Sequence, residues 1–161
     1  MDILELNYLE IEENKEYEDI IRKVIKKCFE EEKLDDKKLY VNVVLTDAKN
    51  IQKINKEHRG IDKPTDVLSF PMFEKDELKN LKLENEDILG DMVISIEQVK
   101  KQAEEYGHGF ERELAYMVVH SFYHLLRLWP YKRRRQTNNE AKGRKYIKKV
   151  KNKEITLWKE K

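Results

Sequence analysis

Residues 112–126 read Arg-Glu-Leu-Ala-Tyr-Met-Val-Val-His-Ser-Phe-Tyr-His-Leu-Leu, a stretch that predicts an apolar helix with two histidines on one face. His120 and His124 are four residues apart, so their Cβ atoms are expected about 5–6 Å apart on successive turns. Helical metal sites use this spacing, as in the zinc motif H-E-x-x-H, although ordinary core and surface histidines also produce it. A catalytic zinc ion normally takes three protein ligands and one water, and no histidine follows His124.

The chain before this helix carries both strand and helix patterns. Alternating or β-branched apolar segments predict strands over residues 3–11, 39–45, 65–71 and 89–95. Apolar residues at three- and four-residue spacing predict helices over residues 16–32, 48–57, 96–106 and 110–126, and the charged residues 74–86 predict a loop. This order favours the α+β class, with a single small mixed sheet backed by helices and the metal site on the last core helix. The predicted core residues of that helix are Leu114, Met117, Val118, Phe122 and Leu125.

The composition is typical of one soluble, cytoplasmic domain. The chain has 161 residues, of which 40% are charged, and it contains no apolar run long enough to cross a membrane. Its acidic N-terminus lacks the basic region of a secretion signal. The single cysteine, Cys28, cannot form an internal disulfide and is predicted to be a structural residue in a reducing compartment. These features predict no membrane association.

Charge divides the chain at residue 127. Residues 127–161 carry 14 Lys and Arg against 3 Asp and Glu, whereas residues 1–126 carry 19 against 29. A basic tail of this kind is typical of an arm that binds nucleic acid. The division falls inside the histidine motif, however, so we treat residues 1–126 as the domain and residues 127–161 as a divergent basic segment.

Three blocks of the sequence together resemble the YbeY family of bacterial endoribonucleases. The blocks are His-Arg-Gly-Ile-Asp-Lys-Pro-Thr-Asp-Val-Leu-Ser-Phe-Pro at residues 58–71, Leu-Gly-Asp-Met-Val-Ile-Ser at residues 89–95, and the start of the histidine helix at residues 112–120. The resemblance covers residues 1–126. It implies zinc-dependent, single-strand-specific RNA cleavage in late 16S rRNA maturation and ribosome quality control. The implied partners are rRNA and the small ribosomal subunit, with no nucleotide cofactor.

The resemblance also implies a ligand set for one Zn²⁺ ion. The family motif H-[GS]-x-L-H-L-x-G-Y-D-H matches His120 and His124, and its third histidine corresponds to Pro130. Arg59 corresponds to a cation that faces the scissile phosphate, where it would stabilise the charge of the transition state. A solvated surface arginine is the structural alternative.

Other candidates for RNA binding or for support of the site are Lys63, Thr65, Asp66 and Asp91. Lys63 is either a phosphate contact or a surface residue. Thr65 and Asp66 either cap a turn or orient Arg59 and the metal pocket, and strand alternation places their side chains on opposite faces. Asp91 either supports the metal ligands or lies in a plain turn. Arg112 and Glu113 are predicted to form a structural ion pair.

A slip of reading frame explains the loss of the third histidine. With suitable synonymous codons, residues 127–132 read one base later become Gly-Tyr-Gly-His-Ile-Lys, which restores the family motif except for one Gly in place of Asp. The same shift converts the arginines at 133–135 to acidic residues and so removes the basic tail. The alternative is a real lineage whose C-terminus has diverged and lost the ligand.

The sequence is compatible with three candidate functions. The first is metal-dependent hydrolysis of RNA phosphodiesters, in which zinc supplies an activated water. The second is a non-catalytic ribosome-assembly or rRNA-binding factor, because the third metal histidine is missing. The third is a metalloprotease, which is disfavoured because Ser121 occupies the place of the glutamate in H-E-x-x-H.

Overall fold

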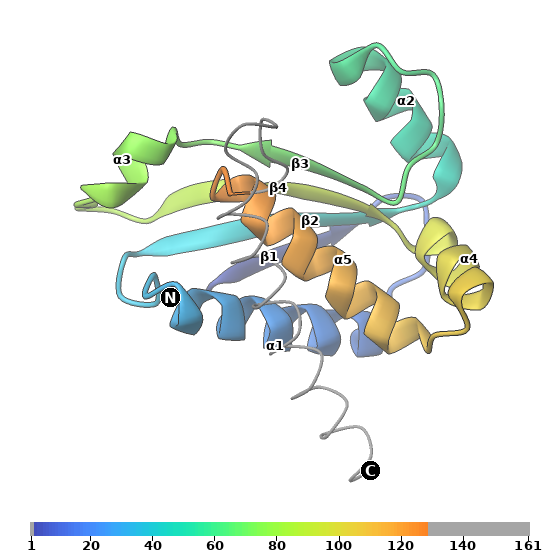
Figure 1. Ribbon diagram of the computed structural model, residues 1–161, viewed down its shortest axis with the longest axis horizontal. Helices are drawn as coiled ribbons and strands as arrows, with labels where there is room; N and C mark the ends of the chain where they lie inside the picture. Colours follow the sequence, from blue (N-terminus) through green and yellow to red (C-terminus); the bar gives the residue numbers. More distant parts are fainter. Residues whose placement is uncertain (1, 129–161) are drawn as a thin grey trace, which may run out of the picture.

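The computed structural model describes residues 2–128, which form one mixed sheet with helices packed against it (Figure 1). The four strands are β1 (Leu4–Tyr8), β2 (Leu39–Thr46), β3 (Val67–Pro71) and β4 (Asp87–Ser95). They lie in the order β1-β2-β4-β3. β1, β2 and β4 are parallel, whereas β3 runs antiparallel to β4 at the edge of the sheet. The predicted α+β class with a single mixed sheet is confirmed.

The helices also follow the predicted order. They are α1 (Lys15–Glu31), α2 (Ala48–Arg59), α3 (Lys75–Lys79), α4 (Ile96–Tyr106) and α5 (Phe110–Leu125). The prediction that residues 74–86 form only a loop was wrong, because α3 lies within them. A capping box between Glu74 and Glu77 stabilises this short helix by satisfying backbone donors in its first turn. The many charged residues of this segment made it look like a loop and hid the capping residues that begin the helix.

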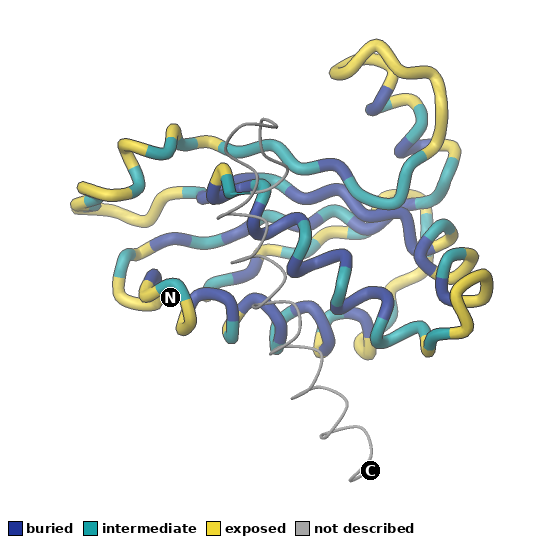
Figure 2. The backbone as a smooth tube through the Cα atoms, viewed as in Figure 1, coloured by how far each residue is buried: buried dark blue, intermediate teal, exposed yellow. Residues whose placement is uncertain are grey.

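The two faces of the sheet are covered unequally. α5 packs against α1, α4 and β3, and its apolar side chains join the main core. Figure 2 shows α5 as a largely buried helix, whereas much of α2 is exposed. On the other face, α2 contributes Ile51 to a small separate cluster with Leu68 and Val93. The core positions predicted on α5 are all buried, as is Cys28.

Gly90 allows α5 to approach the sheet closely. A Cβ atom at Gly90 would lie 2.5 Å from Leu125 Cδ2 and 2.6 Å from the backbone oxygen of Phe70. The glycine therefore permits the end of α5 to rest directly on β4 beside β3. Since Leu125 follows His124, this close approach also fixes where the histidine pair lies relative to the sheet.

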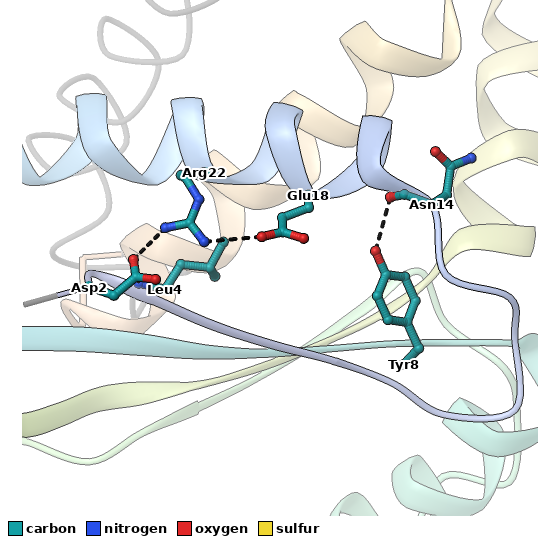
Figure 3. Close-up of polar contacts among 6 residues, drawn as sticks. All are labelled: Asp2, Leu4, Tyr8, Asn14, Glu18 and Arg22. Carbon is teal, nitrogen blue, oxygen red and sulfur yellow. Dashed lines mark hydrogen bonds and ion pairs between the residues drawn. The ribbon is translucent and has the colours of Figure 1, made fainter.

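Polar contacts hold the N-terminal strand to α1 (Figure 3). Arg22 on α1 forms an ion pair with Asp2 and a second one, at 3.2 Å, with Glu18. The Tyr8 hydroxyl donates to the backbone oxygen of Asn14 at 2.9 Å. Asn14 in turn caps α1 by accepting from the Glu16 backbone N–H.

Within the described residues no helix is long and apolar enough to span a membrane.

Candidate metal and nucleic-acid site

A cavity of about 580 Å³ surrounds the exposed side of edge strand β3. One wall comes from the end of α2, another from β3 and the residues before it, and the third from the last turns of α5. The lining residues are His58, Arg59, Thr65, Asp66, Val67, Leu68, Ser69, Phe70, His120 and His124. The topology thus brings together two of the sequence blocks, residues 58–71 and the histidine helix.

His120 and His124 converge on one point at the α5 wall. Their Nε2 atoms are 3.0 Å apart, and their ring centroids are 4.7 Å apart. Two nitrogens bound to one tetrahedral zinc ion lie about 3.3 Å apart, given Zn–N bonds of about 2.0–2.1 Å. The pair therefore fits chelation of a single ion. No third His, Cys, Asp or Glu joins the pair in a metal-binding group among residues 2–128, and Pro130 lies outside the described residues.

Both imidazoles are held in the neutral form that binds metal. Burial lowers the pKa of His124 to about 4, and the charges of His120 and Arg59 act in the same direction. Burial also lowers the pKa of His120, against the opposing effect of the Asp66 carboxylate. Neutral imidazole has the free lone pair that a metal requires. The site is therefore ready to bind a cation at neutral pH.

These depressed pKa values predict that the metal-free protein loses stability in mild acid. The unfolded histidines take up protons near pH 6.5, whereas the folded ones resist protonation, so the stability present above pH 6.5 falls as the pH drops towards 4. After a discount for solvent screening, we expect His124 to contribute about 1–2 kcal/mol of this loss between pH 7 and 4.5. Thermal melts in chelator should show a smaller acid shift for His124→Gln than for the parent.

His108→Gln is the control for these melts, because His108 lies outside the cavity. This variant should keep the acid shift of the parent. Identical pH dependence in the parent and in His124→Gln would contradict the assignment of a buried, neutral His124.

The β3 wall is tied to the histidine helix by two serines. Ser69 Oγ and Ser121 Oγ lie 2.6 Å apart. Ser121 directly follows His120 in the sequence, and it is fully buried. Asp66 accepts from the Val67 backbone N–H at 2.8 Å and from the Thr65 hydroxyl at 3.3 Å. The predicted strand began at Thr65, whereas β3 begins only at Val67, so strand alternation does not apply to Thr65 and Asp66, which both line the cavity.

Arg59 is the candidate cation that reaches the cavity, and Lys63 is outside its lining. Arg59 is the last residue of α2, where Gly60 adopts a left-handed conformation with φ of 69° and ends the helix. Arg59 is exposed, and its positive charge contributes to the lowered pKa of His124. Lys63 is exposed, and its backbone oxygen accepts from the buried Asn55 side chain at 2.9 Å.

Asp91 is not brought to the cavity. Its neighbour Gly90 faces α5, so alternation along β4 turns Asp91 to the opposite face of the sheet. There it accepts a hydrogen bond from the Asn42 side chain at 2.9 Å. Asp91 is therefore neither in a turn nor beside the histidines in this structure.

Arg112 and Glu113 do not form the predicted ion pair, since consecutive helical residues face different directions. Within the described part of the chain, Glu113 is buried on α5 and Arg112 is half-buried.

Two aromatic residues of the cavity were not singled out from the sequence. His58 lies on α2 and Phe70 on β3, and their rings meet edge to face with centroids 5.3 Å apart. The sequence contained one indication of His58, because it directly precedes Arg59 and so lies near the same helix end. Their contact depends on the packing of α2 over β3, which periodicity does not reveal.

Comparison with known proteins supports the motif-based resemblance. The family model described as "Endoribonuclease YbeY" matches residues 5–151. The chain belongs to the YbeY family. Its matched region extends past residue 126, into the segment that carries the altered charge.

Several curated YbeY relatives cover most of the domain. "Endoribonuclease YbeY" of Caldanaerobacter subterraneus subsp. tengcongensis is 48% identical over 114 residues, which are 68% of this chain and 72% of that protein. The protein of the same name from Thermoanaerobacter sp. (strain X514) is 46% identical over 115 residues, with the same coverage of each chain. That of Bacillus thuringiensis (strain Al Hakam) is 43% identical over 117 residues, or 71% and 74% of the two chains. YbeY relatives are thus named as RNA-cleaving hydrolases.

A solved structure shares the fold. The solution structure of TM1509 from Thermotoga maritima superposes with a TM-score of 0.62 at 24% identity, and it covers 98% of this chain and 96% of that one. At this identity the likeness supports the architecture alone.

Proposed function

We propose that this YbeY-family chain is a metal-dependent endoribonuclease that hydrolyses phosphodiesters of single-stranded RNA, with Zn²⁺ held by His120 and His124. The observation that carries the proposal is the convergence of two neutral imidazole Nε2 atoms, 3.0 Å apart, in a cavity that also contains Arg59. Family membership supports the reaction class. This arrangement suits phosphodiester cleavage, because the two chelating histidines and the Arg59 cation line the same cavity.

The protein side chains have separate roles in this reaction. Bound zinc would supply Lewis acidity and a water of lowered pKa. His120 and His124 hold the ion through their lone pairs, and the Ser69–Ser121 contact fixes the helix that carries them. Arg59 sits across the cavity, where its fixed charge stabilises negative charge that develops on the phosphate oxygens. Thr65 and Asp66 order the wall between them.

The proposed biological substrate is 16S rRNA on the small ribosomal subunit, in late maturation and quality control in the cytoplasm. Support comes from the YbeY family and from the open cavity, because an extended single strand reaches such a cavity more readily than a stiff duplex does. Lys63, exposed in the loop that follows α2, would contact the RNA backbone outside the cavity. Asp91 has no place in this proposal.

The conformation at Arg127 supports the reading-frame hypothesis. Arg127 has a φ of 62°, in the left-handed region that favours glycine. The Leu128 N–H donates to the Tyr123 oxygen at 2.8 Å and the Arg127 N–H donates to the His124 oxygen at 2.9 Å, which is the Schellman pattern at a helix end. The YbeY motif and the shifted frame both place glycine at this position. We therefore propose that the native chain continues from residue 127 in the other frame and supplies a third histidine.

A second candidate function is supported by Pro130. If the printed frame is native, the chain holds zinc through two histidines only, and water must fill the other positions. Such a chain would act as an rRNA-binding factor in ribosome assembly. In that case cell growth would depend on binding and would survive the loss of His124.

Arg59→Gln tests the phosphate-facing cation. We expect cleavage of a single-stranded RNA by zinc-loaded protein to fall about 100-fold, because the charge that stabilises the transition state is removed. Lys63→Gln is the matched control, an exposed cation four residues away that is outside the cavity lining, and it should lower activity only a few-fold and mainly through KM. Equal losses for the two variants would overturn the role of Arg59.

A further inference from the structure

We infer that His58 and Phe70 form a stacking platform for an unpaired base of the RNA, next to the phosphate held at Arg59. This inference rests on the proposed function and names how that site recognises single-stranded substrate. It assigns a specificity role to two side chains to which neither the family resemblance nor the metal chemistry gave a role.

The platform shares the cavity with the reacting groups. His58 directly precedes Arg59 at the end of α2, and Phe70 directly follows Ser69 on β3. All four residues line the cavity that the histidine pair closes. A phosphate at Arg59 therefore brings its own nucleoside within reach of the His58 ring. An RNA base needs such an apolar or aromatic surface once it leaves its stacked neighbours.

His58 does not serve as a metal ligand in this structure. Of the histidines lining the cavity, only His120 and His124 have Nε2 atoms in mutual contact, and no group of three metal-binding side chains occurs in residues 2–128. The His58 ring instead packs against Phe70, with an interplanar angle of 66° and centroids 5.3 Å apart. This edge-to-face contact orients the imidazole, while its side chain remains exposed to solvent.

The surface continues along the same face of the edge strand. Leu68 and Phe70 are two residues apart, so their side chains share one side of β3, and Met72 follows the end of that strand. Leu68 is buried under α2, Phe70 is half-buried, and Met72 is 56% exposed. Apolar side chains that emerge progressively from the core beside a cationic pocket are suited to bases that follow a bound phosphate. An RNA duplex keeps its bases stacked inside and gains nothing from this surface.

The test uses the full chain without metal, so that RNA binds but is not cleaved. A short single-stranded RNA carries 2-aminopurine, whose fluorescence is quenched when the base stacks, and anisotropy gives the Kd. We expect His58→Ala to weaken binding about tenfold and to abolish the quenching. His58→Phe should retain both within about twofold, because stacking needs the ring and not the imidazole nitrogens. His108→Ala is the matched control, a histidine beside Tyr106 with ring centroids 6.4 Å apart, outside the cavity.

Salt dependence separates stacking from charge. The slope of log Kd against log salt should be the same for His58→Ala and the parent, whereas Arg59→Gln should lower it by about one phosphate contact. If His58→Ala keeps the parent's affinity and quenching while Arg59→Gln weakens binding, the platform is wrong and the proposed function stands. If the parent binds no single-stranded RNA at all, both are overturned.

Discussion

Restoring the shifted frame at residues 127–130 should raise the bound zinc to one ion per chain. The variant carries Arg127→Gly, Leu128→Tyr, Trp129→Gly and Pro130→His, and its new histidine completes a three-ligand site with one position left for water. We expect zinc affinity to rise at least about 100-fold over the printed sequence, with a comparable gain in RNA cleavage, because one chelating nitrogen replaces a water. Metal analysis after dialysis and a gel assay on single-stranded RNA measure the two effects.

A matched variant distinguishes the effect of the added histidine ligand from the effect of a glycine at the end of the helix. Arg127→Gly alone relieves the left-handed conformation, and it also removes the 3.2 Å ion pair with Glu74 and the hydrogen bond to the Phe73 oxygen. It should leave zinc affinity unchanged. Equal zinc content in the four-residue variant and the printed sequence would refute the three-histidine site.

His124→Ala should eliminate both stable zinc binding and RNA cleavage in the restored chain. It removes half of the chelating pair, whose Nε2 atoms are 3.0 Å apart, so we expect metal affinity to fall at least about 100-fold. His108→Ala should retain full zinc content and activity, since His108 lies on the turn between α4 and α5. Circular dichroism melts of both variants confirm that each is folded.

The same variant distinguishes the two candidate functions in cells. An enzyme with His124→Ala should fail to replace the native gene, because its reaction needs the metal. An assembly factor with the same change should support growth, since it acts by binding rRNA. Growth with His124→Ala together with undiminished ribosome maturation would therefore favour the non-catalytic function.

Much of the fold follows from periodicity, and the exceptions have local causes. The predicted limits of α4 match the structure, because Ser95 caps its start and Gly107, with a φ of 67°, ends it. α3 was missed because a charged segment conceals its capping box. The start of β3 was placed two residues early, since Thr65 and the turn-forming Asp66 were assigned to an extended strand.

The site was only partly predictable because it depends on packing between distant segments. Spacing alone places His120 and His124 on one helix face, and the motif indicates Arg59. The contact between Ser69 and Ser121, the ring contact between His58 and Phe70, and the depressed pKa values arise only when α2, β3 and α5 meet. Strand alternation would have turned Asp91 away from the histidines, had Gly90 been recognised as the residue under α5.

A zinc titration followed by NMR of the histidine side chains tests the metal site most directly. The ¹⁵N-labelled chain has four histidines, of which His58 and His108 are internal controls. We expect added zinc to shift the Nε2 resonances of His120 and His124 together, while those of the controls keep their positions. Zinc that shifts His58 or His108 instead, or that leaves the pair on α5 unchanged, would contradict the assignment of this site and the endoribonuclease mechanism built on it.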